Sequence, residues 1–220
     1  MRPFKKLIQR LKDKNKSIAR VFNDIYHSRR WTGSDSISGT GSGLAQTVAL
    51  RRELSALLKR LNIKSLLDAP CGDFHWMKEV DLGTRCYTGI DIVSDLIVEN
   101  QKKYNNEYRK FISFDISRDP LPQVDMILCR DCFVHLSFKN IIATIKNFKR
   151  SGSKHLLTTT FHKWTKNADI VTGGWRPINL QLRPFSFPDP IQIIDEQCSG
   201  AERQYWDKSL GLWKLEDIQI

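Results

Sequence analysis

The stretch SLLDAPCGDFHWM, residues 65–77, has the outline of a nucleotide-binding turn. It begins with an apolar run that predicts a strand, passes through a turn and continues into helix-like sequence. A dinucleotide-binding turn carries three glycines, whereas this one has Gly72 alone, with Asp68 before it and Asp73 after it. Two carboxylates would repel a pyrophosphate, so the turn favours a ligand that carries positive charge.

The acids that follow along the chain indicate which cationic ligand this is. S-adenosylmethionine has a sulfonium, an α-ammonium group, a ribose and an adenine, and no phosphate. Asp68 is expected to face the ammonium group, and Asp91, about 20 residues after Gly72, is placed to bind the ribose diol. Asp115 ends the next predicted strand and is expected to accept a hydrogen bond from the adenine amino group. The predicted cofactor-binding residues are Trp31, Asp68, Pro70, Gly72, Asp73, Trp76, Asp91, Ile92, Asp115, Ile116 and Arg130.

Short apolar runs alternate with helical periodicity along the rest of the chain. This pattern predicts an α/β fold in which a mostly parallel sheet is covered by helices on both faces. Ligands of such sheets bind at the carboxyl ends of the strands. The predicted strands cover residues 65–69, 86–93, 110–116, 124–129, 154–161, 191–196 and 210–218, and the predicted helices cover residues 44–61, 94–104 and 138–151.

The N-terminal segment holds most of the net charge of the 220-residue chain, which is +11. Residues 1–30 contain ten Lys and Arg against two Asp, and residues 3–22 carry apolar residues at helical spacing. This basic helix either packs on the domain by one stripe or is attracted to an anionic surface, nucleic acid included. We therefore divide the chain into this segment, a lid loop with a helix at 31–61, and a main domain at 62–220.

The segment before the predicted helix at 44–61 is rich in Gly and Ser. Residues 31–43, WTGSDSISGTGSG, predict a loop that is either an idle linker or a lid over the ligand.

Five cysteines without framework spacing favour free thiols and a cytoplasmic location. Cys129 and Cys132 form a CxxC pair without two further ligands, so no metal site is predicted, although a Mg²⁺ ion held by Asp131 and another carboxylate stays open. No apolar run of about 18 residues predicts a membrane span.

The segment CRDCFVHLS, residues 129–137, follows the fourth predicted strand and is therefore expected beside the donor methyl group. Asp131 and His135 are four residues apart and share a face if a helical turn begins here. A neutral histidine is a natural general base for an alcohol proton, and a carboxylate can orient it or take the proton itself. The alternatives are a helix cap for Asp131 and a structural core role for His135.

Residues 162–190 form a long loop-like segment that is rich in aromatic, polar and proline residues. A loop of this length in a compact domain is usually functional. Its aromatic rings can stack on the apolar face of a sugar while polar side chains bind hydroxyl groups; alternatively, its prolines pin the loop and its aromatics plug the end of the sheet. The predicted acceptor-binding residues are Arg130, His162, Asp169, Trp175, Arg176 and Asn179.

The chain resembles the class I S-adenosylmethionine-dependent methyltransferases, and more narrowly small stand-alone members from bacteria and large DNA viruses that are often linked to polysaccharide synthesis. The resemblance covers roughly residues 22–217. It is carried by FNDIY, RRW, SGTGS, LLDAPCGDFHWM, GIDIV, LPQVDMILCRDCFVHLS, LLTTTF, NADIVTGGWRPINL, PFSFPDP and KSLGLW. It implies a Rossmann-like, seven-stranded, mostly parallel sheet with a last antiparallel strand.

The same resemblance implies O-methylation of a sugar hydroxyl, for example of rhamnose in a glycan. It also implies a cytoplasmic enzyme, or one in the host cytoplasm if the protein is viral. Two alternatives stay open. One is an RNA or protein methyltransferase that uses the basic N-terminus, and the other is a non-catalytic module that keeps the cofactor site.

Overall fold

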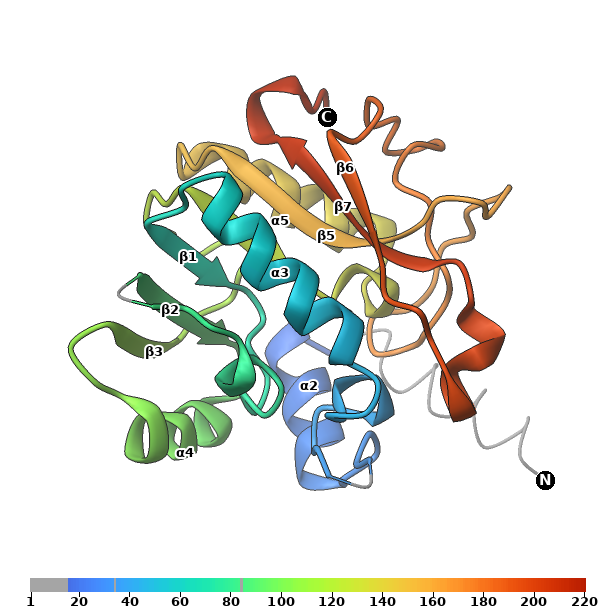
Figure 1. Cartoon of the computed structure of the whole chain (residues 1–220). Helices are drawn as coiled ribbons and strands as arrows, with labels where there is room; N and C mark the ends of the chain where they lie inside the picture. Colours follow the sequence, from blue (N-terminus) through green and yellow to red (C-terminus); the bar gives the residue numbers. More distant parts are fainter. Residues whose placement is uncertain (1–15, 34, 84) are drawn as a thin grey trace.

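The computed structural model describes residues 16–33, 35–83 and 85–220, and Figure 1 shows a twisted sheet flanked by helices. The strands are β1 (Ser65–Asp68), β2 (Cys86–Asp91), β3 (Arg109–Ser113), β4 (Met126–Cys129), β5 (His155–Phe161), β6 (Gln192–Asp195) and β7 (Lys208–Lys214). The α-helices are α2 (Ile18–His27), α3 (Val48–Arg60), α4 (Ser94–Tyr104) and α5 (Phe138–Arg150). Short 3₁₀ turns are η1 (Thr40–Ser42), η2 (Met77–Glu79), η3 (Phe133–His135), η4 (Gly200–Tyr205) and η5 (Leu215–Asp217).

The strands form one seven-stranded sheet in the order β3-β2-β1-β4-β5-β7-β6. Neighbours from β3 through β5 pair in parallel, whereas β7 runs antiparallel to both β5 and β6. The predicted α/β fold, with its antiparallel last strand, is confirmed. The strand order reverses between β1 and β4, and such a reversal opens a crevice at the carboxyl ends of the strands. Because β7 is antiparallel, its first residue, Lys208, pairs with Phe161 at the end of β5 and lies at this same edge.

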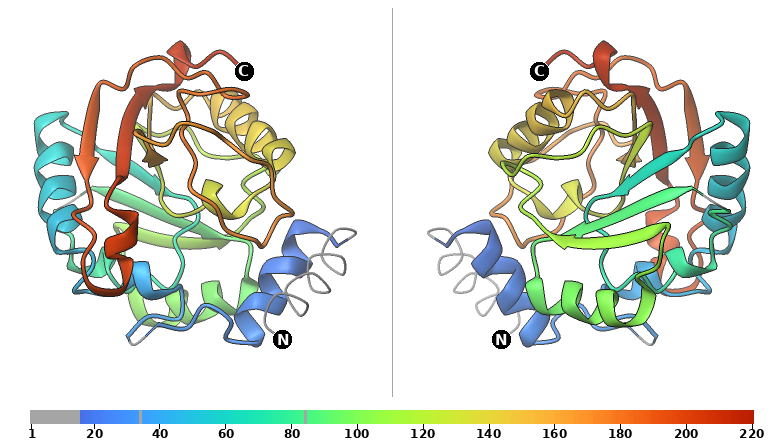
Figure 2. Two further views of the ribbon diagram at one scale, coloured as in Figure 1. Left: turned by 90° about the vertical axis from the view of Figure 1, so that its right-hand side faces the viewer. Right: turned by 90° about the vertical axis from the view of Figure 1, so that its left-hand side faces the viewer.

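The core has two layers because successive strand residues point to opposite faces of a sheet. Leu66 of β1 packs in the layer that contains Leu54 of α3. Its neighbour Leu67 packs in the other layer with Ile145 of α5, and all four side chains are fully buried. Figure 2 shows α3 and α5 on opposite sides of the sheet.

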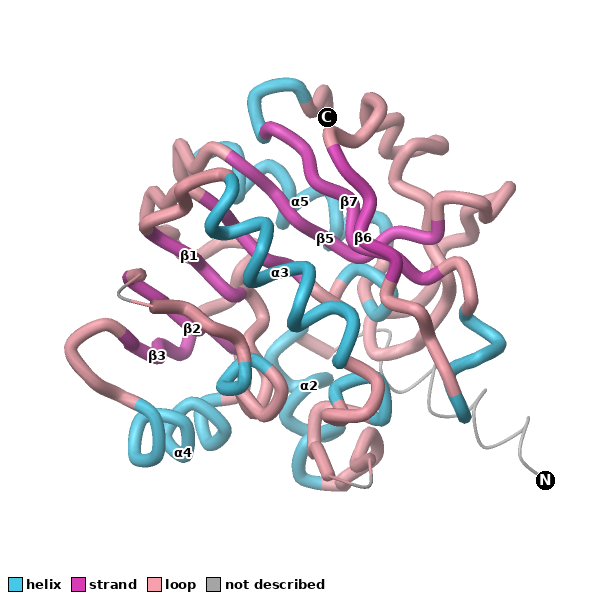
Figure 3. The backbone as a smooth tube through the Cα atoms, in the orientation of Figure 1, coloured by secondary structure: helices cyan, strands magenta, loops and turns pink. Residues whose placement is uncertain are grey.

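Two segments outside these layers lie near the carboxyl edge. Helix α2 begins after Ser17, whose hydroxyl accepts a hydrogen bond from the Arg20 backbone N–H at 3.3 Å. Residues 1–15 of the predicted basic segment lie outside the described residues. The segment between β5 and β6 is long and has no helix or strand of its own, as Figure 3 shows in pink. Among the described residues, none of the helices has the length and apolar character that a bilayer crossing requires.

Candidate active site

A cavity of about 500 Å³ opens at the carboxyl edge of the sheet. Its walls come from the ends of β1, β2 and β4, the segment after β3, helix α2, the lid loop at 31–42 and the η4 turn. Segments that are far apart in the sequence therefore meet around one space. The predicted site residues that line it are Trp31, Asp68, Pro70, Gly72, Asp73, Trp76, Asp91, Ile92, Asp115, Ile116, Arg130, Asp131, His135 and Trp175.

Two buried carboxylates stand at the ends of β1 and β2. Asp68 is 3% exposed and accepts a hydrogen bond from the Tyr87 hydroxyl at 2.7 Å. Burial raises the pKa of Asp68 to about 7, and the Tyr87 hydrogen bond offsets this only in part. Burial also raises the pKa of Asp91 to about 6, although its carboxylate accepts the backbone N–H groups of Val93 at 3.0 Å and Gly72 at 3.2 Å.

The third strand-end acid, Asp115, is held by its own loop. Its Oδ1 accepts both the backbone N–H of Ser117 at 2.9 Å and the Ser117 hydroxyl at 2.6 Å, and Oδ2 lies 3.3 Å from Nε of Arg118. Ile116 follows it in the cavity wall. The ends of β1, β2 and β3 thus bring a carboxylate each to one cavity.

The turn at Gly72 packs closely against the loop at 31–43. Gly72 has φ of +54°, and a Cβ placed on it would lie 2.5 Å from Oγ of Ser38, so a larger residue would collide with the lid. Asp73 binds the lid directly: its Oδ2 accepts the Ser36 hydroxyl at 2.8 Å and the Ile37 backbone N–H at 3.0 Å. Asp73 therefore holds the loop at 31–43 against the turn at Gly72, a contact that the sequence pattern did not predict.

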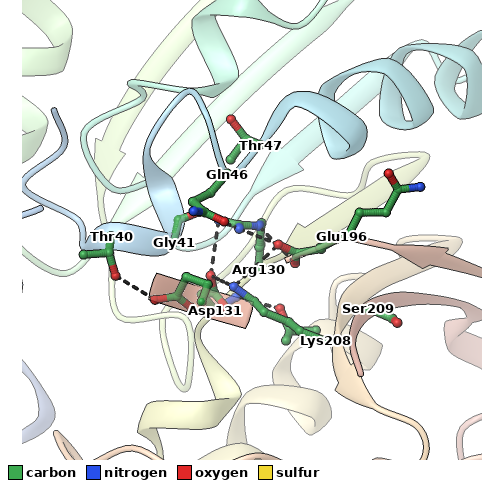
Figure 4. Close-up of polar contacts among 12 residues, drawn as sticks. Thr40, Gly41, Gln46, Thr47, Arg130, Asp131, Glu196, Lys208 and Ser209 are labelled. Carbon is green, nitrogen blue, oxygen red and sulfur yellow. Dashed lines mark hydrogen bonds and ion pairs between the residues drawn. The ribbon is translucent and has the colours of Figure 1, made fainter. Parts of the chain in front are cut away.

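A charged cluster lies after β4, the strand that pairs with β1, and Figure 4 shows its contacts. Arg130 is 4% exposed in its side chain and contacts Glu196, with Nη2 and Oε2 2.6 Å apart. Lys208 places Nζ 2.7 Å from Oδ2 of Asp131 and 3.5 Å from Oε2 of Glu196. The Arg130 guanidinium also donates to the lid carbonyl of Gly41 at 2.8 Å. Two cations and two carboxylates thus neutralise one another and anchor the lid.

Asp131 differs from its predicted arrangement. The helical turn begins only at Phe133, and Asp131 precedes it with φ of +52°, so no helix face is shared with His135 and no helix is capped by its side chain. Burial alone would raise the pKa of Asp131, but Arg130 and Lys208 together lower it to about 2. Asp131 is therefore a permanent anion of the cluster and a weak proton acceptor.

His135 has the geometry of a neutral base. Its Nδ1 lies 2.7 Å from the Gly174 carbonyl oxygen, which can only accept, so Nδ1 carries the hydrogen and Nε2 of the neutral ring keeps its lone pair. Burial lowers the pKa of His135 to about 4, against the opposing effects of the Gly174 carbonyl and Asp131. Trp31 of the lid stacks on the imidazole, with ring centroids 4.2 Å apart.

Four predicted acceptor residues lie outside the cavity wall and contact the protein instead. Asp169 accepts the backbone N–H of Phe138 at 2.7 Å, at the start of α5. Arg176 donates to the Leu136 carbonyl at 2.8 Å and to the Phe133 carbonyl, and thereby holds the turn that carries His135.

The other two hold the loop at the edge of the sheet. Asn179 donates to the carbonyls of His162 at 3.1 Å and Trp164 at 2.9 Å. His162 places Nδ1 3.2 Å from Oδ1 of Asp207. Of the residues predicted in this loop, Trp175 alone reaches the cavity in the described structure.

Sequence reasoning missed the cavity residues Lys208, Glu202 and Tyr205, and also the buried Glu196. A signal existed for two of them. Glu196 directly follows β6, and Lys208 opens β7, which starts at this edge because it is antiparallel. In the described part of the chain, no three His, Cys, Asp or Glu side chains come together as a metal site.

No protein-family model and no curated protein matches the chain. Solved structures, in contrast, match the chain. Magnesium protoporphyrin IX methyltransferase from Synechocystis PCC 6803, with bound SAM, has a TM-score of 0.60 at 12% identity over 90% of this chain and 97% of that one. The chain has the class I methyltransferase fold.

Two further structures agree with this fold. Human N-acetylserotonin methyltransferase in complex with SAM has a TM-score of 0.60 at 12% identity and covers 96% of this chain and 66% of that one. A Burkholderia thailandensis 1,6-didemethyltoxoflavin-N1-methyltransferase with bound S-adenosylhomocysteine has a TM-score of 0.56 at 15% identity, over 90% and 86%. The acceptors in these names differ widely, so the shared fold does not indicate the acceptor of this chain.

Proposed function

We propose that this protein is an S-adenosylmethionine-dependent O-methyltransferase that acts on a sugar hydroxyl. One observation carries the proposal: a single cavity joins two kinds of group. At the ends of β1 and β2, Asp68 and Asp91 are buried carboxylates that form no ion pair among the described residues. In the same cavity, His135 presents a ring nitrogen that carries no proton.

The residues present fit the cofactor. A buried carboxylate with a raised pKa gains a counter-charge when an ammonium group binds, which suits Asp68 to the amino-acid part of the ligand. Asp91 would bind the ribose diol, and Asp115 with Ile116 would bind the adenine. When bound, S-adenosylmethionine supplies an electrophilic methyl group on a positively charged sulfur.

The chain then has to remove one proton and exclude water. S-adenosylmethionine held here would supply the methyl group, and Nε2 of His135 would accept the proton that the acceptor hydroxyl loses on methylation. Gly174 holds the tautomer that leaves Nε2 free. Trp31 covers the imidazole, and this part of the lid keeps solvent from the base.

The acceptor class rests on an aromatic wall. Trp175 stacks near Tyr205, with ring centroids 4.6 Å apart, and meets Phe161 edge-on at 6.2 Å. Trp175 remains 39% exposed, so part of its ring is available to a ligand. Such a group of aromatic rings suits the apolar face of a sugar.

Label transfer tests the proposal. The protein is incubated with methyl-labelled S-adenosylmethionine and three pools: rhamnose-containing oligosaccharide, total RNA and cell protein. We expect label in the oligosaccharide. Label in RNA, lost at high salt, would instead favour the basic N-terminus as the acceptor-binding segment.

A pair of tryptophan variants sharpens the result. Trp175→Ala removes a ring from the cavity wall, whereas Trp164→Ala removes a similarly exposed ring of the same loop that lies outside the wall. We expect the first to raise the acceptor KM at least tenfold and the second to leave it unchanged. Equal effects of the two variants would contradict an acceptor site at Trp175.

A further inference from the structure

The lining of the cavity has the opposite sign to the protein around it. Of the described residues that line the cavity, the acids are Asp68, Asp73, Asp91, Asp115, Asp131 and Glu202. The lining cations are Arg30, Arg130 and Lys208. A chain with a net charge of +11 therefore encloses a negatively charged site. The cofactor has a single net positive charge and balances only part of the excess.

The two cations at the acceptor end are already engaged. Lys208 is 4% exposed and contacts Asp131 at 2.7 Å, and Arg130 contacts Glu196 at 2.6 Å and Asp131 at 3.2 Å. Phosphate is normally bound by Arg or Lys groups that are free to donate. A phosphate here would have to draw one of these cations from its carboxylate and leave a buried anion unpaired, which is costly.

The remaining cation does not change this balance. Arg30 follows α2 and is exposed to solvent. An arginine that is exposed to solvent is screened by salt and attracts an anion weakly.

Glu202 adds a negative charge that forms no ion pair among the described residues. Its Oε1 accepts the Thr40 hydroxyl at 2.7 Å, which ties the η4 turn to the lid. Glu202 lines the same cavity as Trp175 and Tyr205. A carboxylate beside aromatic rings accepts hydrogen bonds from uncharged hydroxyl groups and repels a phosphate.

We infer that the acceptor is an uncharged glycan, presented as a glycoside or chain end, and neither a nucleoside-diphosphate-linked sugar nor a nucleic acid. The inference rests on the proposed function, because it specifies the form in which the sugar reaches the same site. It follows from the charges and contacts of the acceptor end and applies to whichever sugar is used.

Calorimetry on the full chain saturated with S-adenosylhomocysteine tests this inference. The probes are a rhamnose-terminated trisaccharide and the deoxythymidine-diphosphate form of rhamnose, which share the sugar and differ in charge. We expect the trisaccharide to bind at least tenfold more tightly. Tighter binding of the nucleotide form, or no binding of the trisaccharide, would overturn the inference while normal cofactor binding left the cofactor part of the proposed function standing. Failure to bind S-adenosylhomocysteine at all would instead overturn the proposed function.

A charge-neutral variant provides the matched test. Glu202→Gln keeps an oxygen that can accept from Thr40 and removes the negative charge, whereas Glu107→Gln removes the charge of an exposed glutamate outside the cavity wall. We expect Glu202→Gln to narrow the preference for the trisaccharide at least threefold and Glu107→Gln to leave it unchanged. An unchanged preference in both variants would show that Glu202 does not select against phosphate.

Discussion

At the proposed cofactor end of the cavity, Asp68 and Asp91 are buried without an ion pair among the described residues, whereas at the adjoining, proposed acceptor end Asp131 and Glu196 share Arg130 and Lys208. The pKa values follow this difference. Burial raises that of Asp68 to about 7, while neighbouring cations bring that of Asp131 to about 2 in spite of burial.

This difference distinguishes carboxylates that are suited to bind a cationic ligand from carboxylates that stabilise the fold. A buried carboxylate that has hydrogen bonds but no cation beside it costs the fold free energy, and a cationic ligand can recover that cost. A carboxylate with its own buried cation is satisfied within the chain and has little to gain from a ligand. Asp68 and Asp91 are thus suited to an incoming positive charge, whereas the paired cluster holds the loop at 31–43 through the Gly41 carbonyl.

The largest effect is expected from removing one cation of the buried ion-pair cluster. Lys208→Met leaves Asp131 and Glu196 to share Arg130 alone, and removing one partner of a buried ion pair costs about 3 kcal/mol of unfolding free energy. Urea unfolding measures the change.

A surface ion pair supplies the control for that measurement. Lys154 contacts Asp125 at 2.8 Å, almost the same distance as the Lys208 pair, but its side chain is 67% exposed. Lys154→Met should cost less than about 1 kcal/mol. Similar losses in both variants would mean that burial does not distinguish the two pairs.

The second effect concerns the base at the acceptor end. His135→Ala should lower kcat about a hundredfold and leave the Kd for S-adenosylmethionine unchanged, because it removes the proton acceptor without touching the strand-end acids. His155→Ala, at the start of β5 on the opposite edge of the sheet, is the control and should retain full kcat. A drop in cofactor affinity equal to the drop in kcat would assign His135 to binding rather than to proton transfer.

The difference between the two ends also explains what sequence could predict. Asp68, Asp91 and Asp115 follow consecutive strands, and parallel strands end at one edge, so their meeting in one cavity follows from the pattern. The acceptor end depends on pairing between distant segments. Lys208 reaches Asp131 only because β7 returns antiparallel beside β5, 77 positions further along the chain.

Local backbone geometry explains the other predicted site residues whose arrangement differs in the structure. Asp131 has a left-handed conformation, which a helical four-residue spacing cannot anticipate. Arg176 and Asn179 look like sugar-binding residues by type, yet Arg176 donates to the carbonyls of Ala168 and Leu136 and Asn179 donates to those of His162 and Trp164. Both side chains therefore satisfy backbone carbonyl groups instead of facing the cavity.

A smaller effect is expected at the cofactor end from Asp91→Ala. Loss of the ribose hydrogen bonds should weaken S-adenosylmethionine binding by about 1–3 kcal/mol, measured by calorimetry. The change also frees the backbone N–H of Gly72, so Asp91→Asn, which keeps one acceptor oxygen, should weaken binding less. Affinity that is unchanged in Asp91→Ala would remove Asp91 from the ribose site.

The smallest effect is a pH dependence of cofactor affinity. It should arise from Asp68, which forms no ion pair among the described residues, and not from Asp131. Without ligand, Asp68 has a pKa of about 7, and a bound ammonium group would lower it, so binding at lower pH must release a proton. Affinity should therefore rise as pH increases towards 7 and level off above it, with about a tenfold difference between about pH 6 and pH 8 for one such group. Asp68→Asn cannot titrate and should flatten this profile, while Asp131→Asn should leave its shape unchanged, because Asp131 stays ionised throughout that range. A wild-type profile that is already flat would mean that the ammonium group does not bind at Asp68.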